Sequence, residues 1–431
     1  MTLTRLTAAL LLAASAVTAS ADEWTLDRCI AYAIDNNIDV RTRSLQISSA
    51  ELEVDDARNR FLPTAQGYAS QNFNFGRALT MDNTYANRNT SSFAAGAQLS
   101  LPLFQGLGAV RRMGYAKANL AAVLEQAEAA KDDVTLNVIS GYLQALYTSE
   151  LSAVARERVA MSRRDLERTQ ALVDEGRLPE LDLCQAQAQL SQDELSAVRA
   201  ANDSTLALLD LSQILNLPAD ADFRIRPLDD SLPPLMTADE VFEAAMARNH
   251  TIRAAELQTE AAERNVSVAK TGYIPTLSFS AGLGTNYYHT SGINNESFGG
   301  QMRHNFSQSV GFSLSVPIFD AFATRNSVRR ARIESENARL RLDDARMQLY
   351  KAINQAYTQA LGAARQREAT AAALTSARAA YDAMTVKYDN GRANATELEK
   401  AKSDYTNAMA ESVRSRYELI LRSRILSFYA K

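Results

Sequence analysis

The chain has 431 residues, of which 22% are charged, and its formal net charge is −4. This length allows two average domains, and the slightly acidic balance without a basic patch argues against a nucleic-acid-binding protein. The chain has only two cysteines and three histidines, in no metal or redox spacing, and it contains no nucleophile elbow, phosphate loop or nucleotide-binding turn. We therefore expect no enzymatic activity, no cofactor and no metal. Cys29 and Cys184 are expected to be buried thiols, with a single disulfide as the alternative.

The first 21 residues predict a secretory signal peptide, with a buried N-terminal helix as the alternative. Arg5 supplies the positive charge, residues 6–17 form an apolar run, and Ala19-Ser20-Ala21 is a small-residue cleavage site. The run is too short to cross a membrane as a helix, and no later segment approaches about eighteen uninterrupted apolar residues. Any membrane-spanning part of the mature chain is therefore expected to be β-structure.

Four landmarks occur twice in the same order, which predicts an internal two-fold repeat. The paired segments are 25–37 with 237–249, 61–64 with 273–276, 101–104 with 316–319, and 173–177 with 388–392. We accordingly expect four parts along the chain: a signal peptide (1–21), a first repeat (22–215), a linker (216–236) and a second repeat (237–431).

The sequence of each repeat predicts one helix, two strands, a very long helix and a return helix. In the first repeat the expected ranges are 25–60, 64–75, 91–103, 109–174 and 179–215. In the second repeat they are 238–271, 276–288, 307–319, 324–388 and 394–429. Polar loops, 76–90 and 289–306, separate the paired strands. All nine prolines fall at element ends or in the linker, which supports these boundaries because proline disrupts a helix interior.

Ser307–Phe319 is the clearest strand. Between Val310 and Ile318, apolar residues alternate with serine and glycine, so that one face of the strand is apolar. The length, about ten residues, is what a tilted strand needs to cross a bilayer. The same pattern also suits a strand of a soluble sandwich, whose apolar face lies against a core. Pro102 and Pro317 are expected to end strand pairing, because proline lacks a backbone donor.

Four strands are too few to close a membrane barrel, since the smallest such barrels have about eight. Open edges in lipid would leave backbone groups without partners, so the strands are expected to join those of other copies. Two copies give a barrel filled by side chains, whereas three give one wide enough for a duct. The long helices carry apolar residues at coiled-coil spacing and must pack together. An ordinary antiparallel bundle is the alternative arrangement for these helices.

With these features in view, the mature chain resembles the TolC-like outer-membrane efflux protein family along its whole length. The resemblance rests on the duplication, the two Gly-Arg turns, the strand starts Phe61-Leu62-Pro63 and Tyr273-Ile274-Pro275, and the strand ends Leu101-Pro102-Leu103-Phe104 and Val316-Pro317-Ile318-Phe319. It implies an α+β membrane protein. In this fold a homotrimer shares a 12-stranded outer-membrane β-barrel, four strands per chain, on a long periplasmic α-helical barrel.

The resemblance also implies a function. Such a protein is the exit duct of a tripartite efflux pump or a type I secretion system. Its implied partners are a periplasmic adaptor, an inner-membrane transporter and the lipid of the outer membrane. A periplasmic coiled-coil scaffold without a membrane barrel is the alternative function. The family places adaptor contacts at the helical turns, which makes Gly176, Arg177, Gly391 and Arg392 candidate docking residues. The two glycines also suit plain helix caps.

One acid lies six residues beyond each of these glycines. The two acids, Asp182 and Glu397, are candidates for the pore constriction. Glu397 matches the first acid of a ring that narrows the pore in the family, but the position of the second acid is Lys400 here, so a double ring is not expected. A single acidic ring can still concentrate cations. The alternative is an acid that interacts with the positive end of its helix dipole.

Overall fold

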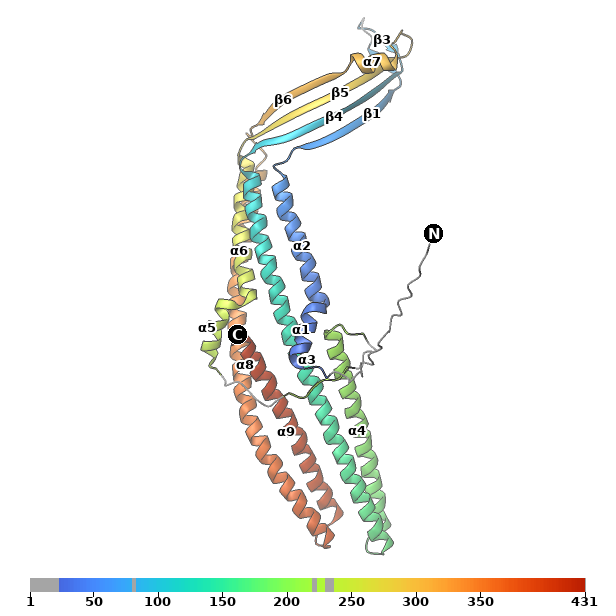
Figure 1. Ribbon diagram of the computed structural model, residues 1–431, viewed down its shortest axis with the longest axis vertical. Coiled ribbons are helices and arrows are strands. Elements are labelled where there is room, and N and C mark those ends of the chain that lie inside the picture. Colours follow the sequence, from blue (N-terminus) through green and yellow to red (C-terminus); the bar gives the residue numbers. More distant parts are fainter. Residues whose placement is uncertain (1–22, 80–82, 219–222, 229–235, 431) are drawn as a thin grey trace, which may run out of the picture. The chain divides into compact units, whose positions relative to one another are not determined.

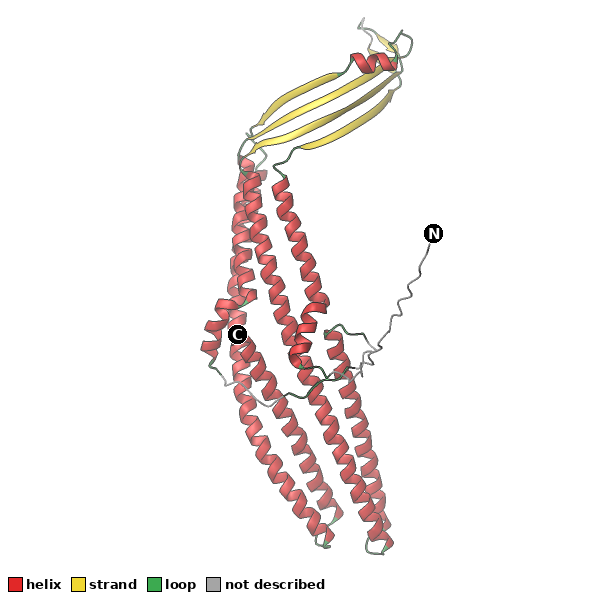
Figure 2. Cartoon of the chain, in the orientation of Figure 1, coloured by secondary structure: helices red, strands yellow, loops and turns green. Residues whose placement is uncertain are grey.

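The computed structural model describes residues 23–79, 83–218, 223–228 and 236–430, and most of these residues are helical (Figures 1 and 2). The predicted signal peptide, residues 1–21, lies outside the described residues, as does much of the predicted linker. Within the described part of the chain, no helix combines the length and the apolar character that crossing a membrane requires.

The main elements occur in the predicted order, twice over. The first half contains α1 (Leu26–Asn36), α2 (Ile38–Asn59), β1 (Thr64–Asn74), β4 (Thr90–Gln105), α3 (Gly108–Asp174) and α4 (Glu180–Ile214). The second half contains α5 (Ala238–Arg248), α6 (His250–Ala269), the 3-10 helix η1 (Lys270–Tyr273), β5 (Thr276–Thr290), β6 (Ser307–Ser315), α8 (Ala323–Asp389) and α9 (Ala395–Ala430).

The two predicted polar loops contain short elements that the sequence did not indicate. A small hairpin, β2 (Arg77–Leu79) with β3 (Tyr85–Asn87), lies in the first loop, and a short helix, α7 (Phe298–His304), lies in the second. Ser297 caps α7 by accepting a hydrogen bond from the Gly300 backbone N–H at 3.2 Å. Side-chain caps of this kind allow a short helix to form within a polar segment.

The chain divides into two compact units, and each unit takes segments from both halves of the sequence. Unit 1 consists of Met1–Arg41, Lys131–Phe242 and Ile353–Lys431, and unit 2 consists of Thr42–Ala130 and Glu243–Ala352. Unit 2 holds the sheet together with the helix segments next to it, and unit 1 holds the two helical turns. The predicted boundaries of the two sequence repeats do not correspond to these units and stay a prediction.

Unit 2 contains an antiparallel sheet of four strands in the order β1-β4-β5-β6 (Figure 1). Strand β4 pairs with β5 from Thr90↔Thr290 to Gln105↔Thr276, so the two halves of the sequence meet in the middle of the sheet. Strands β1 and β6 are the outer strands, and each has one edge without a partner strand among the described residues. The sheet is therefore open.

Two predicted strand ends were wrong. Strand β6 ends at Ser315 and not at Phe319; pairing stops before Pro317, which confirms the prediction that this proline ends it because it cannot donate to the ladder. Pro102, in contrast, lies inside β4 opposite Ser278, and the register shifts between Pro102 and Phe104. A local irregularity of this kind accommodates proline within a strand, so pairing continues to Gln105.

Each of the two predicted first helices is broken at an asparagine. Asn37 separates α1 from α2, and Asn249 separates α5 from α6, both with extended backbone angles. The Asn249 side chain accepts a hydrogen bond from the Ile252 backbone N–H at 3.0 Å, and the Asn37 side chain accepts one from the Asp39 N–H at 2.8 Å. Asparagine competes with the helix in this way and then caps the next one. The single helices expected over 25–60 and 238–271 are therefore corrected.

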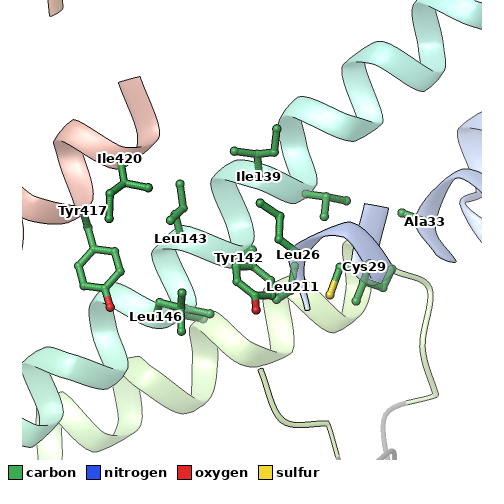
Figure 3. Close-up of a cluster of buried hydrophobic side chains, with 14 of the residues drawn as sticks. Leu26, Cys29, Ala33, Ile139, Tyr142, Leu143, Leu146, Leu211, Tyr417 and Ile420 are labelled. Carbon is green, nitrogen blue, oxygen red and sulfur yellow. The ribbon is translucent and has the colours of Figure 1, made fainter. Parts of the chain in front are cut away.

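The main apolar core lies in unit 1 and draws on four helices, α1, α3, α4 and α9 (Figure 3). Its largest fully buried side chain is Tyr142, whose hydroxyl lies 2.9 Å from the Trp24 carbonyl oxygen and 2.5 Å from that of Arg226. Trp24 also forms a parallel bridge with Ile225. Tyr142 thus ties the start of the described chain to the segment that joins the two halves.

The cysteines do not form a disulfide, and only one of them is buried. Cys29 lies in the core and is fully buried, whereas Cys184 is exposed on α4. Burial raises the pKa of the Cys29 thiol to about 12. The expectation of two buried thiols was therefore right for Cys29 and wrong for Cys184.

Candidate functional site at the helical turns

The two turns in unit 1 have the same backbone structure. Gly176 and Gly391 have φ angles of +70° and +65°, in the left-handed region that favours glycine. The Arg177 N–H donates to the Leu172 carbonyl at 2.9 Å, and the Arg392 N–H donates to the Lys387 carbonyl at 2.8 Å. These bonds, with those from each glycine N–H, form Schellman caps at the ends of α3 and α8.

The return helices begin differently. Helix α4 starts after Pro179, which has no side-chain cap. Helix α9 starts after Asn394, whose side chain accepts a hydrogen bond from the Glu397 N–H at 2.9 Å, while the Glu397 carboxylate accepts one from the Asn394 N–H, also at 2.9 Å. This reciprocal pair is a capping box. The Glu397 carboxylate therefore has a structural partner within its own chain, while its side chain remains exposed.

A buried lysine lies two turns along α9 from this cap. Lys402 is 1% exposed, and its ammonium group donates to Ser162 at 3.0 Å, to Asp165 at 3.1 Å and to Glu399 at 2.5 Å. A lysine has three donors, so all three are used. Ser162 and Asp165 belong to α3, whereas Glu399 belongs to α9. Lys402 therefore links α3, which ends at the turn of the first half, to α9, which begins after the turn of the second half.

The network extends to α4 through Asp193, whose side chain is 2% exposed. Asp193 accepts hydrogen bonds from Arg158 at 2.8 Å, from Ser162 at 2.5 Å and from Gln189 at 3.0 Å. Ser162 therefore accepts a hydrogen bond from Lys402 and donates one to Asp193. Three carboxylates and two cations form this cluster, which consists of Arg158, Asp165, Asp193, Glu399 and Lys402. We call it the buried cluster after its two buried members, Asp193 and Lys402; the other three are partly exposed.

The environment of Lys402 keeps it charged. Burial alone would lower the lysine pKa, but the hydrogen bonds and charges of Glu399 and Asp165 more than offset that effect and raise the pKa above its ordinary value. Buried ion pairs of this kind add little to stability compared with apolar packing, but losing one partner is costly. The cluster links α3, α4 and α9, and an arrangement that separated Lys402 from its carboxylates would leave a buried charge unpaired.

A groove of about 580 Å³ lies among α3, α4 and α9, and most of the cluster forms part of its lining. Its lining includes Asp182, Tyr388, Lys400 and Lys402. Of the six candidate residues from the sequence, only Asp182 lines this groove. Glu397 lies at the α9 cap, and Gly176, Arg177, Gly391 and Arg392 are exposed at the turns. In the described ranges, no group of three or more His, Cys, Asp or Glu side chains is placed to hold a metal ion.

The sequence indicated the turns but not the buried cluster. Lys402 and Asp193 lie among many charged residues on long helices, where most charges face water, and nothing in their spacing distinguishes them. The one available signal is that neither charge is repeated in the other half of the sequence. The position equivalent to Asp193 is Ala408, and the position equivalent to Lys402 is Gln187. That signal is weak, because surface positions of a repeat vary freely.

Comparison with known proteins places the chain in a family. The family model for outer membrane efflux proteins matches residues 29–217 and again residues 241–428. The chain is 24% identical to outer membrane protein TolC of Vibrio cholerae, over 96% of this chain and 92% of that protein. It is 27% identical to protein CyaE of Bordetella pertussis, over 73% of this chain and 65% of that protein.

The fold is also shared with solved structures. The crystal structure of the Campylobacter jejuni CmeC outer membrane channel superposes with a TM-score of 0.77 at 17% identity, covering 94% of this chain and 85% of CmeC. At this identity the similarity concerns the fold alone.

Proposed function

Because the chain belongs to the outer membrane efflux protein family, we propose that it is the exit channel of a tripartite efflux pump or a type I secretion system. In this role it resides in the outer membrane, extends into the periplasm and passes substrates to the outside. It receives them from an inner-membrane transporter and a periplasmic adaptor. It acts as a channel and not as an enzyme.

The open sheet of unit 2 carries this proposal. All residues of β1 are exposed, and so are all residues of β6 except Gly311. The apolar face predicted for β6 is among the most exposed parts of the chain, with the Phe312 side chain 70% exposed. In the described residues no second sheet covers this face, which disfavours the soluble sandwich of the scaffold alternative. An exposed apolar face on this scale suits a lipid environment.

The two free sheet edges favour an assembly. Unpaired backbone groups in lipid cost several kcal/mol each, so membrane sheets close into barrels. Three copies of a four-stranded sheet supply twelve strands, enough for a barrel that encloses a duct. A homotrimer with a shared 12-stranded barrel satisfies both edges of every copy. The helices of the three copies then form the periplasmic helical barrel, and the internal two-fold repeat supplies two similar helix pairs per copy.

The two turns are the proposed docking surface for the adaptor. The Arg177 side chain is largely exposed and makes only a surface ion pair with Glu175 at 3.4 Å, which contributes little energy. Arg392 is exposed as well. Nothing lies within 4 Å of a Cβ placed on Gly176 or Gly391. The residues Gly176, Arg177, Gly391 and Arg392 are therefore accessible to a partner.

The proposed pore constriction contains Glu397 and Asp182. Glu397 is exposed at the start of α9, so three copies can present a ring of three carboxylates to the channel. Its capping box keeps the carboxylate in one position. Asp182 lines the groove among α3, α4 and α9. Either acid can attract cations, and Lys400 in the same groove opposes the effect.

Conductance across a planar bilayer tests the channel function. The mature protein, purified from outer membranes in mild detergent, should insert and give discrete conductance steps. A chain that stays soluble after osmotic shock, without detergent, and gives no steps would instead support the periplasmic scaffold.

A further inference from the structure

A second groove, of about 420 Å³, lies in unit 2 between η1 and the first turns of α8. It is lined by Lys270, Tyr273, Arg325, Val328, Arg329 and Arg332. Four of these six residues are cations and none is an acid. Among the described residues, Lys270, Arg329 and Arg332 form no ion pair within 4.0 Å, and the lining of the groove supplies no counter-charge. We call it the basic groove.

The position of these arginines is unfavourable for the helix that carries them. The start of a helix is the positive end of its dipole, where acidic residues are preferred. Helix α8 has no acid in its first turn, and Arg325, Arg329 and Arg330 follow instead. Arg325 and Arg329 are four residues apart, which places like charges side by side. Asp320, just before the helix, accepts a hydrogen bond from the Thr324 N–H at 2.8 Å and acts as the cap.

The basic groove adjoins an exposed apolar surface. Ile318, Phe319 and Phe322 lie between the end of β6 and the start of α8, and Ile318 is 95% exposed. The ring centres of Phe319 and Phe322 lie 5.5 Å apart in an edge-to-face arrangement, and the Arg325 guanidinium lies 5.6 Å from the Phe322 ring centre. Along the chain, an exposed apolar strand is thus followed by exposed aromatic rings and then by cations. This order is typical of a segment that passes from hydrocarbon through a lipid–water interface.

We propose that the basic groove binds the phosphate headgroup of an anionic phospholipid in the periplasm-facing leaflet of the outer membrane. The inference rests on the proposed function, in which the sheet spans that membrane and α8 starts at its periplasmic surface. A phosphate there supplies the counter-charge that Lys270, Arg329 and Arg332 lack within the chain. The exposed Phe319 and Phe322 then contact the acyl chains of the same leaflet. Charge complementarity favours lipid over a second copy of the groove, which would bring like charges together.

The test compares lipids on the purified trimer in detergent. Phosphatidylglycerol should raise the thermal unfolding midpoint of the wild-type protein more than phosphatidylcholine does, and native mass spectrometry should show bound phosphatidylglycerol. The double variant R329Q/R332Q removes two exposed charges and keeps good helix formers. A basic residue near an anionic lipid surface contributes about fivefold in affinity, so the variant should bind phosphatidylglycerol about 25-fold more weakly.

The control is R365Q/R378Q, which removes two exposed arginines from the same helix outside the basic groove. It should keep the wild-type lipid response. A wild-type response that does not distinguish the two lipids would overturn the proposal, and so would a response that R329Q/R332Q retains. If inorganic phosphate alone reproduced the shift, the groove would be a free-anion site and not a lipid site. Absence of the wild-type protein from outer membranes would instead contradict the proposed function itself.

Discussion

Lys402 is a residue at which a single substitution should destabilise the chain strongly. Replacing it with methionine keeps the aliphatic volume but leaves Asp165 and Glu399 without their buried cation. Removing one partner of a buried ion pair costs about 3–5 kcal/mol, and we expect about 3 kcal/mol because both carboxylates retain some contact with water. The thermal midpoint of the helical circular dichroism signal should fall by several degrees. Lys400→Met, two residues away and exposed, is the matched control.

The same residue gives a pH dependence with a defined sign. Since its pKa is raised in the folded state, the stabilisation by Lys402 is complete below the unfolded-state pKa, roughly 10.4. It is lost as the pH rises through the higher folded-state pKa. The stability difference between the wild-type protein and Lys402→Met should therefore be constant from neutral pH to about 9.5 and shrink at more alkaline pH. A difference that grows as the pH rises above the ordinary lysine pKa of 10.5 would contradict this assignment.

The two cysteines should differ in reactivity. At pH 8, a thiol with a pKa of about 12 is ionised in only about one molecule in ten thousand, and Cys29 is also fully buried. Maleimide should therefore add once to each folded chain, at Cys184, and twice after unfolding in guanidinium. Cys184→Ser should abolish labelling of the folded protein. Two labels on the folded chain would show that the core around Cys29 opens.

Glu397 allows its structural role to be separated from its proposed role in the pore. Glutamine at this position keeps the capping box but removes the charge. We expect Glu397→Gln to keep wild-type stability and to weaken the block of channel current by divalent cations. Glu411→Gln, another exposed acid on α9, serves as the control. Unchanged block in Glu397→Gln would leave Glu397 with only its helix-capping role.

At the scale of elements, alanine should lower the stability of the chain at a turn glycine and raise it at a glycine inside a helix. Gly391→Ala places a Cβ on a left-handed residue and should destabilise the chain by about 1 kcal/mol. Gly362→Ala lies inside α8 with nothing within 4 Å of the new Cβ, and should stabilise it by about 0.5–1 kcal/mol. Chemical unfolding of both variants measures the two signs. A neutral Gly391→Ala would mean that the Schellman cap does not form.

The elements also show which features the sequence could specify. The long helices α3 and α8 were predicted to within about two residues, because their ends carry turn glycines and their interiors lack proline. The breaks at Asn37 and Asn249 were missed, since apolar periodicity continues on both sides of each asparagine. Pro102 was misplaced because the effect of proline in a strand depends on the register of the neighbouring strand, which the sequence does not contain.

Single side chains were harder to predict than elements. The capped turns followed from local sequence, because a left-handed residue selects glycine. The buried cluster did not, because Lys402 becomes buried only when α3 and α9, separated by 240 positions between Ser162 and Lys402, pack together. Long-range contacts of this kind leave no periodic signal in a helix that already carries many charges.

At the scale of the whole molecule, the open sheet is the feature that favours the proposed assembly. Its four strands leave two free edges and an exposed apolar face, which the strands of further copies and lipid would cover. The repeat, the open sheet and the very long helices were all expected from the sequence. The number of copies, three, is a prediction from the barrel size that twelve strands allow and from the family resemblance.

Native mass spectrometry of the mature protein, extracted from outer membranes in mild detergent, measures how many chains assemble. We predict a mass of three mature chains, because three copies of the four-stranded sheet close a barrel with room for a duct. A monomer that remains soluble after removal of detergent would contradict the account, since the sheet would then have no membrane to cross and no other copies to pair with.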